Sequence, residues 1–264
     1  TVLTGTIQRV EQRLVRVDLG KATGILPASE QIPGEFYNSG ARLKVYLKDV
    51  ERTMRGPQLI LSRGNEAFIE HMFRSEVPEM ENGAVEIKAI AREAGVRTKL
   101  AVTSTVPGVD PVGTFVGGHG TRVQAVMSEI GDQEKIDIIT YSEELDEFIK
   151  NALSPTEVNE VSVDEKEKKA QVKVAEDQLS IAIGKSGQNV RLASRLVGYD
   201  IDIEADGQVV RAEGSKPKQP KKLKGKHEIE ASLLDAIEEV EEAPAEATDE
   251  AVEKSDDNDD KTEE

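Results

Sequence analysis

Several residue types and patterns on which protein chemistry often depends are absent from this 264-residue chain. It has no cysteine, which excludes disulfides and thiolate metal sites and is compatible with a reducing cytoplasm. Its three histidines, at 71, 119 and 227, form no metal-binding pattern. No apolar run approaches the roughly 18 residues of a transmembrane helix, and no signal peptide is visible. We therefore expect a cytoplasmic protein with no membrane segment, metal or other cofactor.

Basic charge is scarce overall, but its distribution changes what that means. The chain has 34 Lys and Arg against 51 Asp and Glu, a net charge of −17, which argues against phosphate contacts. Residues 227–264 alone hold 17 acidic and 2 basic side chains. The remaining 226 residues are therefore nearly neutral, at −2, and nucleic-acid binding by them is not excluded.

The first 62 residues predict a small β-barrel. Thr1 is followed at once by a strand-like pattern, so we expect a chain truncated or processed at its N-terminus. Five short strands separated by turn residues are typical of a closed barrel of the OB type. We place these strands at residues 2–7, 14–19, 22–26 (broken by Gly24), 42–47 and 58–62.

Residues 63–213 predict one αββααβ unit that occurs twice, at 63–141 and 142–213. The segment Val116–Val123 (VGGHGTRV) aligns with Ile183–Val190 (IGKSGQNV) at an offset of 67 residues. Equal order of elements and equal spacing indicate a tandem repeat. The expected fold class is α+β. We place the elements of the first unit at 65–77, 85–90, 98–102, 110–131 and 135–140, and those of the second at 143–153, 158–163, 170–174, 178–198 and 200–204.

A G-x-x-G loop lies between the paired helices of each unit, at Gly117–Gly120 and Gly184–Gly187. Glycine lets the backbone approach a phosphate, and the next helix begins with free N–H groups. This arrangement is typical of KH domains, whose loop clamps a four-nucleotide single strand. One such loop could be a simple turn, but two at equivalent places favour RNA binding. The predicted RNA-binding residues are Gly117, Gly118, His119, Gly120, Arg122, Gly184, Lys185, Ser186, Gly187, Gln188, Asn189 and Arg191; Lys185 would contact phosphate, and the last three would reach base edges or sugar.

Two further basic groups are candidates for RNA contact. Arg92, Arg97 and Lys99 lie in a predicted hairpin, where they would contact phosphates or form a solvated tip. In the barrel, a basic face could bind RNA weakly, and a purely structural barrel is about equally favoured. That face would use Arg9, Arg13, Arg16, Arg42 and Lys44, with Phe36, Tyr37 and Tyr46 as the available aromatic residues.

Catalytic motifs are missing. There is no G-x-x-x-x-G-K-[ST], no G-x-S-x-G and no cysteine nucleophile. His119 has Asp110 nearby in sequence, yet its place in a phosphate-type loop favours a weak hydrogen-bond donor over a general base. We expect no enzymatic activity.

Several motifs lie between residues 91 and 193, within a region of resemblance to a known family that covers about residues 1–207. They are Ala91–Val102 (AREAGVRTKLAV), Asp110–Gly113, Arg122–Gln124, Lys135–Ile138, Asn151–Pro155 and Ala182–Ala193 (AIGKSGQNVRLA). With the order barrel, KH, KH, they closely resemble the NusA family of bacterial transcription termination/antitermination proteins. The resemblance implies an S1 domain at 1–62 and two type II KH domains. It also implies binding of nascent RNA and RNA polymerase, control of pausing, termination and antitermination, and no catalysis. Other antitermination factors are possible partners, and we expect a monomer.

Three departures from the family pattern stand out. We expect this chain to lack the family's N-terminal polymerase-binding domain. Ala94 replaces a usual proline, and Gly118-His119 replaces a pair that often contains a basic residue. Two alternatives stay open: an S1/KH protein of RNA decay or the ribosome, and a polymerase adaptor that does not need the loops. Polynucleotide phosphorylase joins the same modules in the other order, behind a catalytic core that is missing here.

The last 51 residues differ in composition from the rest. Residues 214–226, with the run KPKQPKKLKGK, predict a basic linker, and residues 227–264 predict a disordered acidic tail. In the tail, Ile229, Leu233, Ile237 and Val240 could share one face of a marginal helix. The tail could solvate the chain, bind a partner, or compete with RNA as a polyanion.

Overall fold

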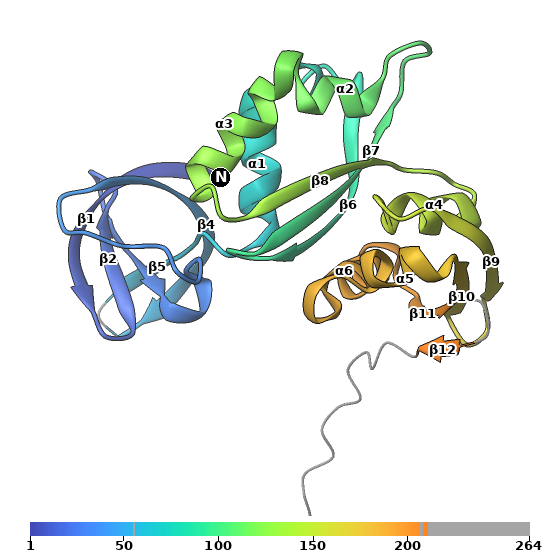
Figure 1. Ribbon diagram of the computed structural model, residues 1–264. Helices are drawn as coiled ribbons and strands as arrows, with labels where there is room; N and C mark the ends of the chain where they lie inside the picture. The colour runs from blue at the N-terminus through green and yellow to red at the C-terminus, as the bar shows by residue number, and fades with distance from the viewer. Residues whose placement is uncertain (55, 206–207, 211–264) are drawn as a thin grey trace, which may run out of the picture. The chain divides into compact units, whose positions relative to one another are not determined.

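The computed structural model describes residues 1–54, 56–205 and 208–210 (Figure 1). The predicted linker at 214–226 and acidic tail at 227–264 lie outside the described residues. The described residues all belong to one compact unit.

The first five strands close into a barrel, as predicted. They are β1 (Val2–Glu11), β2 (Leu14–Asp18), β3 (Thr23–Pro27), β4 (Arg42–Thr53) and β5 (Gly56–Ser62), in the order β1-β2-β3-β5-β4, with a short 3-10 helix η1 (Ala28–Glu30) after β3. Alternating residues such as Val15, Val17 and Leu61 fill the interior. Gly24 lies inside β3 and does not break it. Its lack of a side chain leaves room for Leu61, because a Cβ on Gly24 would lie 2.6 Å from Leu61 Cδ1.

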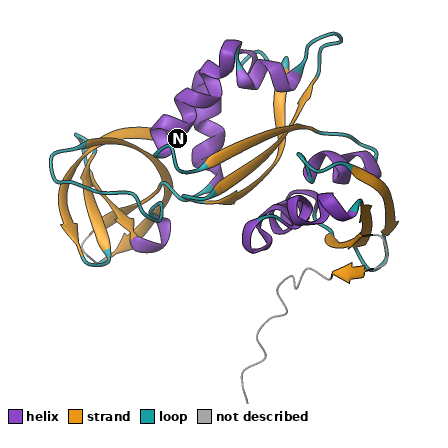
Figure 2. Cartoon of the chain, in the orientation of Figure 1, coloured by secondary structure: helices purple, strands orange, loops and turns teal. Residues whose placement is uncertain are grey.

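The first αββααβ unit follows directly. It comprises α1 (Glu66–Glu76), η2 (Pro78–Met80), β6 (Val85–Glu93), β7 (Arg97–Ser104), α2 (Pro111–Val116), η3 (Gly118–Gly120), α3 (Thr121–Ile130) and β8 (Lys135–Thr140). The Asn65 side chain caps α1 by accepting a hydrogen bond from the Ala67 amide at 2.8 Å. Strand β7 is central, antiparallel to β6 and parallel to β8. Helices α1 and α3 lie on one face of this sheet (Figure 2).

The second unit repeats this order. Its elements are α4 (Leu145–Ala152), β9 (Val158–Asp164), β10 (Lys169–Val174), α5 (Glu176–Ile183), η4 (Lys185–Gly187), α6 (Gln188–Val197) and β11 (Asp200–Ala205). Strand β11 is parallel to β10, as β8 is to β7. A further strand that the sequence did not predict, β12 (Gln208–Val210), pairs with β11.

Helix α6 joins the two units. It packs on β11 of its own unit and also on β6 and β7 of the first unit. Leu192 and Leu196 of α6 belong to the same apolar core as Ala91 and Ala101 of the first sheet, and all four are buried. The two repeats therefore share a core rather than meeting through a linker.

Candidate nucleic-acid interface

The two G-x-x-G loops have the same backbone conformation. The first glycines, Gly117 and Gly184, have φ/ψ of 76°/168° and 73°/173°. The third residues, His119 and Ser186, lie at 54°/25° and 53°/30°, in the left-handed region that is uncommon for residues with a side chain. The same unusual path, built from different side chains, indicates a conformation that the fold imposes at both places.

The first glycine of each loop is required by geometry. Its combination of positive φ and extended ψ is accessible almost only to glycine. The space is also occupied, because a Cβ on Gly117 would lie 2.8 Å from Arg122 Cγ, and one on Gly184 would lie 2.8 Å from Asn189 Cβ. The start of the loop is thus fixed against the following helix.

We expect Gly184→Ala to destabilise the chain by about 2 kcal/mol, because strain and close contact add. The matched control is Gly187→Ala, where φ is 72° but nothing lies within 4 Å of the added Cβ, so we expect a smaller loss. Urea denaturation followed by circular dichroism measures both. Equal losses for the two variants would contradict the close approach at Gly184.

Each loop presents its two middle residues to solvent. Gly118 and His119 in the first loop, and Lys185 and Ser186 in the second, are exposed. The helices α3 and α6 begin directly afterwards, and the first amides of a helix lack intrahelical acceptors and carry partial positive charge. Both loops therefore offer what a phosphate group requires, and Lys185 adds a full charge to the second.

The polar residues that follow the loops do different things. Asn189, predicted to reach RNA, is buried, and its Nδ2 donates to the carbonyl oxygens of Leu153 at 3.0 Å and Ala182 at 3.2 Å. It occupies the position of Arg122 in the first repeat, whose guanidinium donates to Thr114 O at 2.7 Å. Burial makes Asn189 a structural residue, and we leave it out of the proposed contact surface. Gln188 is half-buried at the start of α6.

The predicted basic hairpin is not a solvated tip. The Arg92 side chain is 1% exposed and pairs with the buried Glu134 through Nε–Oε1 and Nη2–Oε2 distances of 2.8 and 2.9 Å. Lys99 is fully buried, with its Nζ 3.0 Å from Ser154 O, and burial lowers the pKa of Lys99. Only Arg97, which pairs with Asp137, retains some exposure. Because Arg92 and Lys99 have no free access to solvent, we also leave them out.

Much of the basic face predicted on the barrel is paired. Arg9 and Arg16 both contact Glu11, and Lys44 lies 3.4 Å from Glu129 of α3. Arg13 and Arg42 are exposed. Of the three aromatic residues, Tyr37 and Tyr46 are half-buried and Phe36 is 89% exposed. RNA contact by the barrel stays a prediction.

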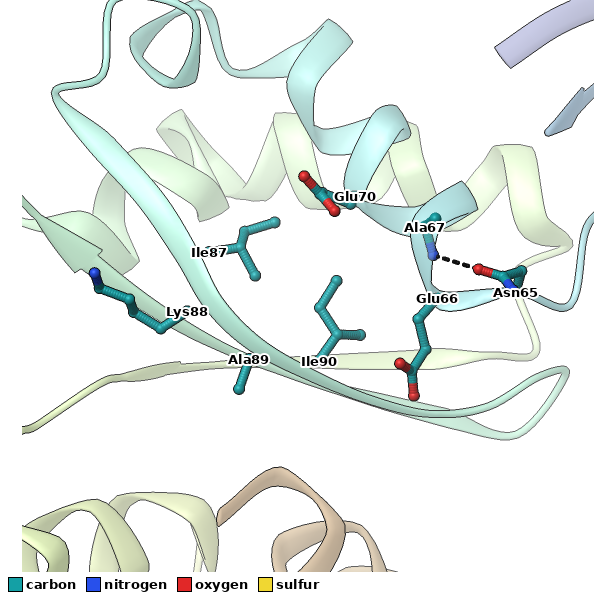
Figure 3. A pocket seen from close by; sticks show the side chains of 8 residues that line it. All are labelled: Asn65, Glu66, Ala67, Glu70, Ile87, Lys88, Ala89 and Ile90. Carbon is teal, nitrogen blue, oxygen red and sulfur yellow. Dashed lines mark hydrogen bonds between the residues drawn. The ribbon is translucent and has the colours of Figure 1, made fainter. Parts of the chain in front are cut away.

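A pocket of about 350 Å³ lies away from both loops, between α1 and β6 (Figure 3). Asn65, Glu66, Ala67 and Glu70 line it from the side of α1, and residues 87–90 line it from β6. None of the predicted RNA-binding residues lines it. Within the described part of the chain, no cluster of His, Asp or Glu could hold a metal, and no helix is long and apolar enough to span a membrane.

Comparison with known families agrees with this architecture. The S1 RNA binding domain matches residues 1–62, the NusA-like first KH domain matches 63–141, and the NusA-like second KH domain matches 145–211. The chain is a NusA homologue. The barrel is therefore an S1 domain, and the two units are KH domains, here called the first and second KH repeats.

Individual NusA proteins match over the same region. The transcription termination/antitermination protein NusA of Thermus thermophilus is 55% identical over 204 residues, 77% of this chain and 52% of that protein. NusA of Bacillus subtilis is 47% identical, over 78% of this chain and 55% of that protein. The chain thus spans about half the length of these relatives. Among solved structures, "Crystal structure of APE1850" superimposes with a TM-score of 0.39 and 24% identity, over 53% of this chain and 97% of that one.

Two candidate functional residues, Glu93 and Arg195, were not predicted from the sequence. Glu93, the last residue of β6, contacts Arg191 and Arg195 of α6. The signal for Arg195 was present, because it follows Arg191 by four residues and so lies on the same face of the helix. The role of Glu93 depends on the packing of the two repeats, which the sequence alone does not reveal.

Proposed function

We propose that this chain is the RNA-binding part of a cytoplasmic transcription termination/antitermination factor. It would bind nascent single-stranded RNA through its KH repeats, associate with RNA polymerase, and modulate pausing, termination and antitermination without catalysis. The observation that carries this proposal is the pair of G-x-x-G loops with one shared backbone path, each directly before a helix. The matches to NusA proteins support the transcriptional role.

The two loops would contribute unequally. The second loop has the exposed cation Lys185, whereas the first has Gly118 at the equivalent position. Arg122, the nearest cation after the first loop, donates to Glu79 Oε1 at 3.1 Å and is thereby partly neutralised. A backbone hydrogen bond and Arg122 together lower the pKa of Glu79, which keeps this carboxylate charged. We propose that the second loop binds phosphate more strongly than the first.

Gly118→Lys is therefore expected to tighten binding of single-stranded RNA about threefold at low salt, by giving the first loop a cation. The position accepts a side chain, because nothing lies within 4 Å of an added Cβ and the φ of Gly118 is not positive. Fluorescence anisotropy with a labelled RNA measures the change. Gly118→Gln is the uncharged control, and an equal gain with glutamine would show that charge is not the cause.

Association with polymerase is tested by a pull-down of the full chain against RNA polymerase, with and without RNase. We expect RNA polymerase to retain the chain in both cases, and to retain less of it after RNase treatment. Retention of ribosomes or nucleases in place of polymerase would favour a role in RNA decay or translation. Retention that is unaffected by changes in both loops would favour a polymerase adaptor.

Two further experiments test the oligomeric state and the domain boundaries. Analytical ultracentrifugation tests the expected monomer, and limited proteolysis tests the proposed boundaries at residues 62, 141 and 213.

A further inference from the structure

Two arginines of α6 converge on one carboxylate at the seam between the KH repeats. Arg191 Nε and Nη2 lie 2.6 and 3.1 Å from Glu93 Oε1 and Oε2, a bidentate pair. Arg195 Nη2 lies 3.0 Å from the same Oε1 atom. Glu93 belongs to the first repeat and both arginines belong to the second, so the cluster exists only when the repeats are packed together.

The contacts within the protein do not use all the hydrogen-bond donors of this cluster. Each guanidinium has five N–H donors. In the described structure, Arg191 uses three, two on Glu93 and one on Ser186 O at 3.3 Å. Arg195 uses two, on Glu93 and on Arg92 O at 3.3 Å. About half of the donors are therefore free, and the arginine side chains are 39% and 48% exposed.

Charge and position both favour an anion at this place. Two guanidiniums and one carboxylate leave a net positive charge, and Arg191 lowers the pKa of Glu93, which keeps the carboxylate ionised. Ser186, whose carbonyl accepts from Arg191, is the third residue of the second G-x-x-G loop. An RNA strand held by that loop would therefore pass close to the free N–H donors of the arginines.

We propose that Arg191 and Arg195 form a third phosphate site, which binds a phosphodiester of single-stranded RNA at the seam between the repeats and whose strength Glu93 limits. The proposal rests on the proposed RNA-binding function. The phosphate takes the donors that Glu93 leaves free, and planar guanidiniums suit this bidentate recognition. The seam thus extends the RNA surface from the second loop toward the first repeat.

The test uses the full chain and a fluorescein-labelled single-stranded RNA of about 12 nucleotides. This RNA is long enough to extend beyond the nucleotides that one G-x-x-G loop binds. Arg195→Gln is expected to weaken binding about fivefold and to reduce the slope of log affinity against log salt by about 0.7, the value of one phosphate on a single strand. Glu93→Gln is expected to tighten binding about threefold at about 50 mM salt, less at about 200 mM.

The controls are Arg74→Gln and Glu70→Gln, which break an ion pair of 3.0 Å on α1 in which Arg74 is about as exposed as Arg195 and Glu70 is more exposed than Glu93. They make the same charge changes away from the seam, and we expect little effect. The proposal is overturned if Arg195→Gln weakens binding without changing the salt slope, or if Glu93→Gln is no tighter than Glu70→Gln. If the wild-type chain does not bind this RNA at all, the proposed function itself fails, so the two failures are distinguishable.

Discussion

Replacing Lys185 and Ser186 together by aspartate is expected to weaken single-stranded RNA binding about 100-fold and to leave the chain folded. The change removes a charge-assisted phosphate contact of about 2–3 kcal/mol and places two carboxylates where the backbone would meet the strand. Folding is preserved because both side chains are exposed, and because aspartate tolerates the left-handed conformation found at Ser186. Fluorescence anisotropy gives the affinity, and a thermal melt verifies the fold.

The matched control for this variant lies in the first loop. Gly118→Asp with His119→Asp puts the same two residues at the equivalent, equally exposed positions. We expect a smaller loss, of about tenfold, because no lysine is removed. Unchanged affinity in the Lys185/Ser186 variant would exclude the second loop as a contact. A larger loss in the first-loop variant would reverse the proposed order of the two loops.

Arg92→Ala is expected to destabilise the chain by about 3–5 kcal/mol, because it leaves a buried carboxylate without its counterion. Glu134 is fully buried and also accepts hydrogen bonds from Thr98 Oγ1 at 2.6 Å and from the Gly95 amide at 2.8 Å. Arg92 in turn donates to the carbonyl oxygens of Arg63 and Asn65, at the junction between barrel and first repeat. Urea denaturation measures the loss.

Arg97→Ala is the control, since Arg97 pairs with Asp137 at 2.6 Å in the same hairpin but is partly exposed. We expect a loss of at most about 1 kcal/mol. Similar losses for the two variants would mean that the Arg92–Glu134 pair is not buried in solution. The comparison also separates a structural role from RNA binding. If Arg92 served only to bind a phosphate, its replacement would lower the affinity for RNA without lowering the stability of the chain.

Most of the fold could be predicted from the sequence because periodicity reports burial directly. Ile7, Val15 and Leu26 alternate with less buried neighbours and line the barrel. Phe68, Met72 and Phe73 repeat at helical spacing and are buried in α1. The G-x-x-G loops could also be located, because the unusual φ values at their glycines leave a trace in the residue type itself.

The parts that could not be predicted depend on partners distant in sequence. Arg92 looks like a surface cation until Glu134, 42 residues later, is placed beside it. Lys99 is directed to the Ser154 carbonyl, 55 residues away. Asn189 has the appearance of a base-reading amide, but it satisfies the carbonyl oxygens around the loop instead. Charge and polarity in a sequence therefore indicate that a side chain needs a partner, without indicating whether this is RNA or protein.

The shared position of α6 has a consequence for inheritance. This helix belongs to the core of the second repeat, and Leu192 and Leu196 are buried together with Ala91 and Ala101 of the first. Exchange of the second repeat for a KH domain from another gene would place a mismatched helix against those alanines. Glu93 would also lose both of its arginines. We therefore expect the two repeats to be inherited together, with insertions or losses before or after the pair rather than between its members.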